Sequence, residues 1–264
     1  MLTRSRLLKT RMRAGEVTVG AWLSLSCPSV AEIMAQAGFD WLLIDTEHAP
    51  YSQGDLEVTL MAFNGQPTVP IVRVPWNDPV MIKQALDLGA EGILAPWVSS
   101  PDEARRAVAA CKYPPEGARG FGPRRASRYY ADMDAYVASA NDAIIVIVQI
   151  EHIRAVRAIG EILDVPGIDV VMLGPMDLSG SMGCLGDIDH PDVVAAIETV
   201  VAEAQRRGIP AGVPLDATTD RLFEWAERGC RFVIAGEDHS LLRRAAADAL
   251  VSLTSYARRV DREE

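Results

Sequence analysis

Eight short apolar runs, each bounded by turn-forming residues, recur along the chain and constrain its fold more than any other feature. Most are continuously apolar rather than alternating in polarity, which is typical of strands buried on both faces of a parallel sheet. The predicted strands are residues 17–23, 41–44, 69–74, 92–95, 144–150, 170–173, 209–213 and 232–235.

Segments with helical spacing of apolar residues lie between these runs, at residues 30–36, 56–63, 81–88, 102–111, 193–207, 220–228 and 241–249. Pro79 and Pro101 mark helix starts, and Gly38 and Gly89 follow helix ends. Eight strand–helix units with short connections predict a single domain over residues 1–264 that forms a closed (β/α)8 TIM barrel. An open doubly wound sheet is the alternative, but no Gly-x-Gly-x-x-Gly motif follows the first run.

Composition argues against several classes of partner. Acidic residues outnumber Lys and Arg by 36 to 26, and the resulting net charge of −10 disfavours nucleic acid. No apolar run reaches the roughly 18 residues of a membrane span, and the first residues lack the apolar core of a signal peptide. The four cysteines form no CxxC pair, as expected of free thiols in a reducing compartment. A cytoplasmic protein without membrane contact is therefore predicted.

Polar side chains gather just after four of the predicted strands. The carboxyl ends of barrel strands form the active face in this architecture, so these side chains are expected to converge there. The candidates at or just after these strand ends are Asp45, Glu47 and His48 at the second strand, Arg73 at the third, Gln149 and Glu151 at the fifth, and Gly174, Pro175 and Asp177 at the sixth.

Residue chemistry suggests roles for these candidates. Glu151 and Asp177 follow neighbouring strands and could share a hard cation such as Mg²⁺ or Mn²⁺, although each could instead be a surface carboxylate or a helix cap. His48 has carboxylate neighbours that could orient it as a general base. The planar donors of Arg73 suit a carboxylate or a developing enolate, with a structural ion pair as the simpler interpretation.

In their order along the chain, these motifs resemble the HpcH/HpaI class II pyruvate aldolases, the family of the 4-hydroxy-2-oxoheptanedioate and 2-keto-3-deoxy-sugar-acid aldolases. The resemblance covers about residues 20–236 and rests on segments 20–22, 38–50, 112–120, 149–151 and 174–183. Two departures, His152-Ile-Arg after Glu151 and Ser-Gly-Ser-Met-Gly at 179–183, flank the candidate site and bear on the identity of the substrate.

The resemblance implies a barrel of the phosphoenolpyruvate/pyruvate type with one divalent metal ion (Mg²⁺, Mn²⁺ or Co²⁺) held by Glu151 and Asp177. It implies that pyruvate chelates this ion and that Gln149 helps to order the groups around it. Gly174 and Pro175 would line the substrate site.

The same resemblance implies that Arg73 contacts the keto or enolate oxygen and that His48 is the base, supported by Asp45 and by Asp87 from the next helix. It further implies a homo-oligomer, a hexamer built as a dimer of trimers. In that assembly the C-terminal helices are exchanged between subunits.

The expected function is reversible cleavage of a 4-hydroxy-2-oxo acid to pyruvate (or hydroxypyruvate) and an aldehyde by a metal-dependent class II aldolase. A class I aldolase, which forms a Schiff base, is disfavoured because the chain has only three lysines, Lys9, Lys83 and Lys112, and none ends a predicted strand. One alternative is a CoA-thioester lyase of the citrate lyase β or malyl-CoA type, which would bind CoA phosphates through Arg119, Arg124, Arg125 and Arg128. Another is a 2-oxo-acid-binding protein without turnover.

One stretch interrupts the strand–helix alternation. Residues 112–143 begin with a Gly-, Pro- and Arg-rich sequence and are too long for a simple connection, so a functional or mobile loop is predicted. Segments 118–130 and 213–216 are expected to shape the pocket for the aldehyde.

Overall fold

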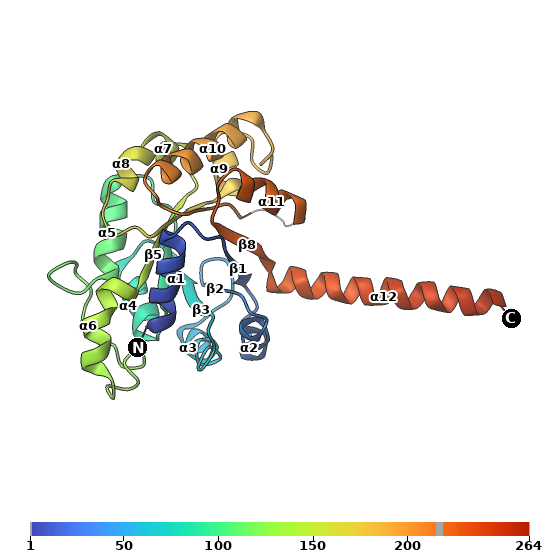
Figure 1. The fold of residues 1–264 in the computed structure, drawn as a ribbon, viewed down its shortest axis with the longest axis horizontal. Coiled ribbons are helices and arrows are strands. Elements are labelled where there is room, and N and C mark those ends of the chain that lie inside the picture. The colour runs from blue at the N-terminus through green and yellow to red at the C-terminus, as the bar shows by residue number, and fades with distance from the viewer. Residues whose placement is uncertain (1, 215–218, 264) are drawn as a thin grey trace.

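The computed structural model describes residues 2–214 and 219–263 and contains one sheet of eight parallel strands (Figure 1). The strand order is β7-β6-β5-β4-β3-β2-β1-β8, and the N–H of Arg231, just before β8, donates to the carbonyl of Ala211 in β7 at 3.0 Å. The sheet therefore nearly closes into the predicted barrel. Its strands are β1 Thr18–Leu23, β2 Trp41–Asp45, β3 Val69–Arg73, β4 Gly92–Ala95, β5 Ile145–Ile150, β6 Val170–Leu173, β7 Ala211–Gly212 and β8 Phe232–Glu237.

Helices surround the sheet and confirm the predicted α/β alternation. Asp78 caps the first turn of α4 by accepting from the N–H groups of Val80 and Met81, and Ser100 caps α5 in the same way; each helix then begins with proline. The helices are α1 Thr3–Arg13, α2 Pro28–Gln36, α3 Gln53–Met61, α4 Pro79–Asp87, α5 Pro101–Cys111, α6 Met133–Ala143, α7 Ile153–Arg157, α8 Ile159–Leu163, α9 Pro175–Ser181, α10 Pro191–Arg206, α11 Thr219–Glu227 and α12 Asp238–Glu263.

Several elements differ from the sequence-based expectation, among them the short helices α7, α8 and α9, which were not predicted. Helix α6 occupies the end of residues 112–143, where a continuous loop was predicted. Strand β7 covers two residues instead of the predicted 209–213. Pro210 has no N–H to donate to a neighbouring strand, which shortens the ladder at that point.

The interior of the barrel is filled by large side chains that stack across it. The rings of Trp41 and Phe232 lie parallel with centroids 3.7 Å apart. Leu8 and Met12 of α1 belong to the same buried cluster, so α1 covers the amino-terminal end of the barrel. A buried ion pair of 2.9 Å between Lys9 and Asp169 holds α1 there.

Helix α12 differs from the other helices because it extends away from the barrel (Figure 1). Its apolar side chains Leu242, Leu250, Val251 and Leu253 are exposed. Within the described ranges no helix is both long and apolar enough to cross a membrane.

A substitution at Gly20 tests how tightly the barrel interior is packed. A Cβ at this position would lie 2.1 Å from the Trp41 ring, so Gly20→Ala is expected to lower the free energy of unfolding by about 1–3 kcal/mol. At Gly54 in α3 the nearest atom to an added Cβ is 3.7 Å away, so Gly54→Ala should leave stability unchanged or raise it. Urea denaturation of both variants measures the difference, and equal stabilities would contradict this account of the packing.

Candidate active site

A cavity of about 450 Å³ opens at the carboxyl ends of the strands. This is the end at which (β/α)8 barrels carry their catalytic groups. The structure brings six of the predicted site residues to its lining, together with apolar side chains from β1 and β8. The six are His48, Arg73, Gln149, Gly174, Pro175 and Asp177.

The guanidinium of Arg73 is held rigidly at the base of this cavity. Asp45 lies opposite Arg73 in the register of β2 and β3, and its two oxygens accept from Arg73 Nε at 2.9 Å and Nη2 at 2.8 Å. The guanidinium carbon also lies 4.4 Å from the centre of the Trp22 ring. Such a bidentate pair fixes both the position and the plane of the cation.

Asp45 acts on His48 differently from the sequence-based expectation. Its Oδ1 accepts from the main-chain N–H groups of Glu47 and His48, at 3.1 and 3.3 Å, and not from the imidazole. The imidazole is exposed, and its Nε2 lies 3.9 Å from Glu47 Oε2. Asp45 therefore shapes the loop that carries His48, because both of its oxygens are already engaged by Arg73 and the main chain.

The sequence suggested only that Glu47 could help to orient His48, whereas the structure also places its carboxylate beside Arg73. Its Oε2 lies 3.3 Å from Arg73 Nη1, without hydrogen-bond geometry, and is buried without a hydrogen-bond partner. Burial raises the pKa of Glu47, and the positive charge of Arg73 opposes that rise. The signal in the sequence was its place directly after a strand end, beside His48.

Glu151 is almost fully buried at the end of β5. Its Oε1 accepts from the main-chain N–H of Trp97 at 2.6 Å. Burial raises the pKa of Glu151 to about 8, the Trp97 hydrogen bond opposes the rise, and the charges of Glu47 and Asp177 add to it. A buried carboxylate in this position is therefore costly unless a positive charge lies beside it.

Gly174 allows the groups around Glu151 to approach closely. A Cβ on Gly174 would lie 2.7 Å from Glu151 Oε2 and 3.0 Å from Gln149 Nε2. Asp177 follows in the first turn of α9 and is half-buried. The N-cap of that helix is Gly174, so Asp177 does not serve as the cap that the sequence left open as an alternative.

The donors at this end of the barrel fit a hard divalent cation. Four carboxylates share this end of the barrel with the guanidinium of Arg73, and they belong to Asp45, Glu47, Glu151 and Asp177. Gln149 Oε1 is also buried without a hydrogen-bond partner. Across residues 2–214 and 219–263, no group of three or more His, Cys, Asp or Glu side chains could hold a metal ion. A cation held by the two carboxylates of Glu151 and Asp177 would therefore have further coordination positions, which water or substrate oxygens could fill.

Asp87 does not lie where it was predicted, beside His48 in the candidate active site. Helix α4 runs back from the carboxyl end of β3, so Asp87, its last residue, lies at the amino-terminal end of the barrel, away from His48. Its carboxylate accepts from Arg119 Nη2 at 2.7 Å. Within one chain Asp87 therefore does not support His48.

The segment 118–130 also lies at the amino-terminal end, because it follows α5, and it does not line the 450 Å³ cavity. Arg119 pairs there with Asp87, and Arg128 pairs with Asp132 at 2.9 Å. In the other segment expected to shape the pocket, Pro214 lines the cavity, whereas residues 215 and 216 lie outside the described residues.

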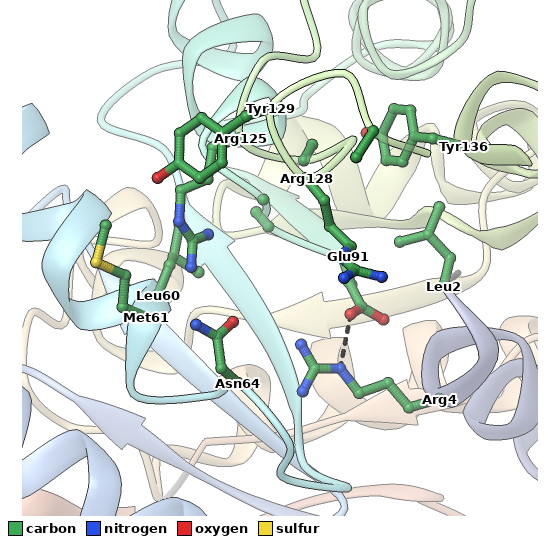
Figure 2. Close-up of a pocket in the computed structure, with 14 residues that line it drawn as sticks. Leu2, Arg4, Leu60, Met61, Asn64, Glu91, Arg125, Arg128, Tyr129 and Tyr136 are labelled. Carbon is green, nitrogen blue, oxygen red and sulfur yellow. Dashed lines mark hydrogen bonds and ion pairs between the residues drawn. The ribbon is translucent and has the colours of Figure 1, made fainter. Parts of the chain in front are cut away.

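A second cavity, of about 640 Å³, lies at the amino-terminal end of the barrel (Figure 2). Its buried carboxylate, Glu91, accepts from Arg4 Nε at 2.6 Å, and Arg4 also donates to the carbonyls of Phe63 and Gln66. These contacts join α1 to α3 and β4. Arg125 and Arg128, two of the arginines that the CoA-lyase alternative assigns to phosphate binding, also line this cavity, whereas the residues predicted for the aldolase site do not.

The chain matches the model of one protein family over residues 18–245. It belongs to the HpcH/HpaI aldolase/citrate lyase family. Both activities in that description make or break carbon–carbon bonds, so the protein is a carbon–carbon lyase, and the predicted aldolase family is confirmed.

Individual relatives agree with this membership. The chain is 46% identical to a 4-hydroxy-2-oxo-heptane-1,7-dioate aldolase of Escherichia coli, over 90% of its own length and 91% of the relative's. A family member from Burkholderia cenocepacia has the same fold, with a TM-score of 0.90, 39% identity and coverage of 94% and 99% of the two chains. The citrate synthase SbnG is similar at a TM-score of 0.84 and 28% identity, covering 95% and 98%.

A substitution at Gly174 tests whether the close approach of Glu151 to the cavity matters for metal binding. Gly174→Ala is expected to displace Glu151 and Gln149 and to weaken Mn²⁺ binding at least about tenfold, or ~1.4 kcal/mol. Gly180→Ala in the same helix is the control, because its Cβ would meet only the exposed side chain of Leu185 at 3.0 Å. Calorimetric titration with Mn²⁺ measures both affinities. Unchanged affinity in Gly174→Ala would contradict the account.

Proposed function

We propose that the protein is a metal-dependent class II aldolase that reversibly cleaves a 4-hydroxy-2-oxo acid to pyruvate, or hydroxypyruvate, and an aldehyde. The observation that carries the proposal is the shared cavity at the carboxyl ends of the strands. The fixed guanidinium of Arg73, the carboxylate of Asp177 and the exposed imidazole of His48 line it, and the buried carboxylate of Glu151 lies beside Gly174 at the same end. A cation, a set of oxygen ligands and a base are the groups that aldol chemistry on a 2-oxo acid needs.

Glu151 and Asp177 would hold one divalent ion, with Mg²⁺, Mn²⁺ and Co²⁺ all suited to two carboxylates. Bound there, the ion would act as a Lewis acid on the 2-oxo group and offset the negative charge that develops when the bond breaks. Gln149, with an unpartnered buried amide oxygen, is placed to order the groups around it. Gly174 and Pro175 line the floor on which the 2-oxo acid would lie.

His48 would start the cleavage by taking the proton from the 4-hydroxyl group, directly or through a water molecule. Its imidazole is exposed at the cavity, so it is free to exchange protons with substrate and solvent. As the C3–C4 bond breaks, the aldehyde leaves and negative charge collects on the oxygen of the pyruvate enolate. Arg73 faces that oxygen with donors held in place by Asp45, and such preorganised charge stabilises the transition state.

The positions of the lysines argue against the Schiff-base alternative. Lys9 is buried in an ion pair with Asp169 at the amino-terminal end of the barrel, Lys83 lies within α4, and Lys112 follows α5. None of the three lines the cavity that holds Arg73. The CoA-thioester alternative loses support for a similar reason, because Arg119 and Arg128 are paired with acids at the far end of the barrel.

Solvent deuterium exchange into the methyl group of pyruvate separates an enzyme from a protein that only binds 2-oxo acids. Exchange followed by proton NMR should require Mg²⁺ or Mn²⁺ and fall at least about a hundredfold in Glu151→Gln and in His48→Ala. His190→Ala provides the control, because His190 caps α10 outside the cavity. Tight binding of pyruvate without exchange in the wild-type protein would instead support the binding module.

The E. coli relative named above acts on 4-hydroxy-2-oxo-heptane-1,7-dioate. Retro-aldol cleavage of that compound between C3 and C4 yields pyruvate and succinic semialdehyde, which we propose as the first aldehyde to test. Tartronate semialdehyde, lactaldehyde and glyceraldehyde are the other candidates, and a screen of aldehydes with pyruvate and hydroxypyruvate distinguishes them. The four free cysteines suit a reducing compartment, and we place this reaction in the cytoplasm.

We further propose that α12 packs against other copies of the chain in a hexamer, a dimer of trimers with exchanged C-terminal helices. The helix has 26 residues and is therefore about 39 Å long, and it extends away from the barrel (Figure 1). Its Leu242, Leu250 and Leu253 are exposed. An exposed apolar surface of this kind marks a site of contact with another protein chain.

The double variant Leu250→Glu with Leu253→Glu should reduce the molar mass measured by light scattering after gel filtration. The physical reason is that two charges would have to be buried in the proposed interface. Leu7→Glu is the matched control, because Leu7 is equally exposed on α1, at the opposite end of the barrel. Wild-type protein that elutes as a monomer would contradict the hexamer.

A further inference from the structure

Trp97 has a backbone conformation that its side chain disfavours. It follows the end of β4 and adopts a φ of +56°, in the left-handed region. A Cβ crowds the backbone there, so glycine and asparagine adopt the conformation readily and other residues seldom do. A bulky residue keeps such a conformation only where its surroundings require it.

Two main-chain hydrogen bonds show what the conformation accomplishes. The N–H of Trp97 donates to Glu151 Oε1 at 2.6 Å, and the N–H of Val98 donates to the carbonyl of Gln149 at 3.2 Å. Pro96 precedes them and has no N–H. The left-handed turn therefore directs two successive N–H groups from the β4 loop to the end of β5, one of them to the side chain of a proposed metal ligand.

The hydrogen bond leaves Glu151 with one oxygen engaged and one oxygen free for a cation. Oε1 is held by the Trp97 N–H, while Oε2 lies on the side of Gly174, which lines the cavity. Because Glu151 is buried, few other donors can reach it, and the rotation of its carboxylate depends on this one N–H. A ligand whose orientation is fixed in advance binds its cation more tightly than one that must be ordered.

We propose that Trp97 is a positioning residue, whose left-handed backbone, and not its indole ring, orients Glu151 for the divalent cation. This inference rests on the proposed function, since it takes Glu151 as a metal ligand. The indole has a neighbour of its own, Trp76, with ring centroids 6.4 Å apart. Ring packing is therefore the competing explanation, and the experiment is designed to separate the two.

The experiment compares Mn²⁺ affinity in five variants of Trp97 in the full chain, from the electron paramagnetic resonance signal of free Mn²⁺. Trp97→Gly and Trp97→Asn accept the left-handed conformation, Trp97→Val and Trp97→Ile resist it because they are β-branched, and Trp97→Phe keeps a ring. Backbone control predicts dissociation constants within about threefold of wild type for Gly and Asn, and at least about tenfold weaker for Val and Ile. Thermal unfolding without metal establishes that each variant is folded.

Ring packing predicts the opposite order, with Phe closest to wild type and with Gly and Asn weakest. That order, or equal affinity in all five variants, would overturn the proposal. Should Val and Ile fail to fold, the affinity of Trp97→Asn still decides, because backbone control predicts it within about threefold of wild type and ring packing predicts it among the weakest. Trp76→Val and Trp76→Asn form the matched control pair and should bind Mn²⁺ equally, since Trp76 is not in the left-handed region.

Glu151→Gln separates this inference from the proposed function. Wild-type protein that binds no Mn²⁺, or Glu151→Gln protein that binds it as well as wild type does, would refute the metal site itself. Loss of binding in Glu151→Gln together with uniform affinity across the Trp97 series would refute only the positioning role.

Discussion

The burial of several carboxylates beside one guanidinium is the constraint on which the functional end of this barrel depends. Asp45 neutralises Arg73 through two hydrogen bonds, which leaves Glu47, Glu151 and Asp177 without a matching cation. Desolvation disfavours that excess of negative charge and raises the pKa of Glu151. A divalent ion would resolve the imbalance, and under the proposed function the same ion would supply the Lewis acid that the reaction requires.

The two ends of the barrel have different roles, because one holds the fold together and the other carries the candidate active site. At the amino-terminal end, α1 covers the core and its charges are paired, as in Lys9 with Asp169 and Arg4 with Glu91. At the carboxyl end, polar atoms such as Gln149 Oε1 remain buried without partners. Buried polar atoms without a partner also occur at the amino-terminal end, as at Glu91 Oε2 and Arg119 Nε, so it is the excess of carboxylates that marks the carboxyl end as the place for a ligand.

Much of this arrangement could be predicted from the sequence, because strand periodicity and the rule for barrel strand ends are local signals. They placed Arg73, Gln149 and Asp177 at one cavity. The family resemblance, in contrast, gave Asp87 a place beside His48 that a single chain does not support. Asp87 is close to the site residues in sequence, but a full helix carries it to the other end of the barrel.

The end of β4 was missed for a related reason. Its residues, Ala95-Pro-Trp97, offer no polar side chain, and the group that matters is a main-chain N–H whose direction depends on φ. The partner of Asp45 was also beyond sequence reasoning, since the register of β2 against β3 decides it. Side-chain identity thus predicted which groups are present, whereas backbone geometry determined which of them meet.

The most direct test of the account is a crystal structure of the protein with Mn²⁺ and pyruvate, with the ion located by its anomalous scattering. The account predicts one peak in contact with carboxylate oxygens of both Glu151 and Asp177, with pyruvate bound to the same ion and Arg73 beside its keto oxygen. An ion bound elsewhere, or pyruvate held in the cavity without one, would contradict it.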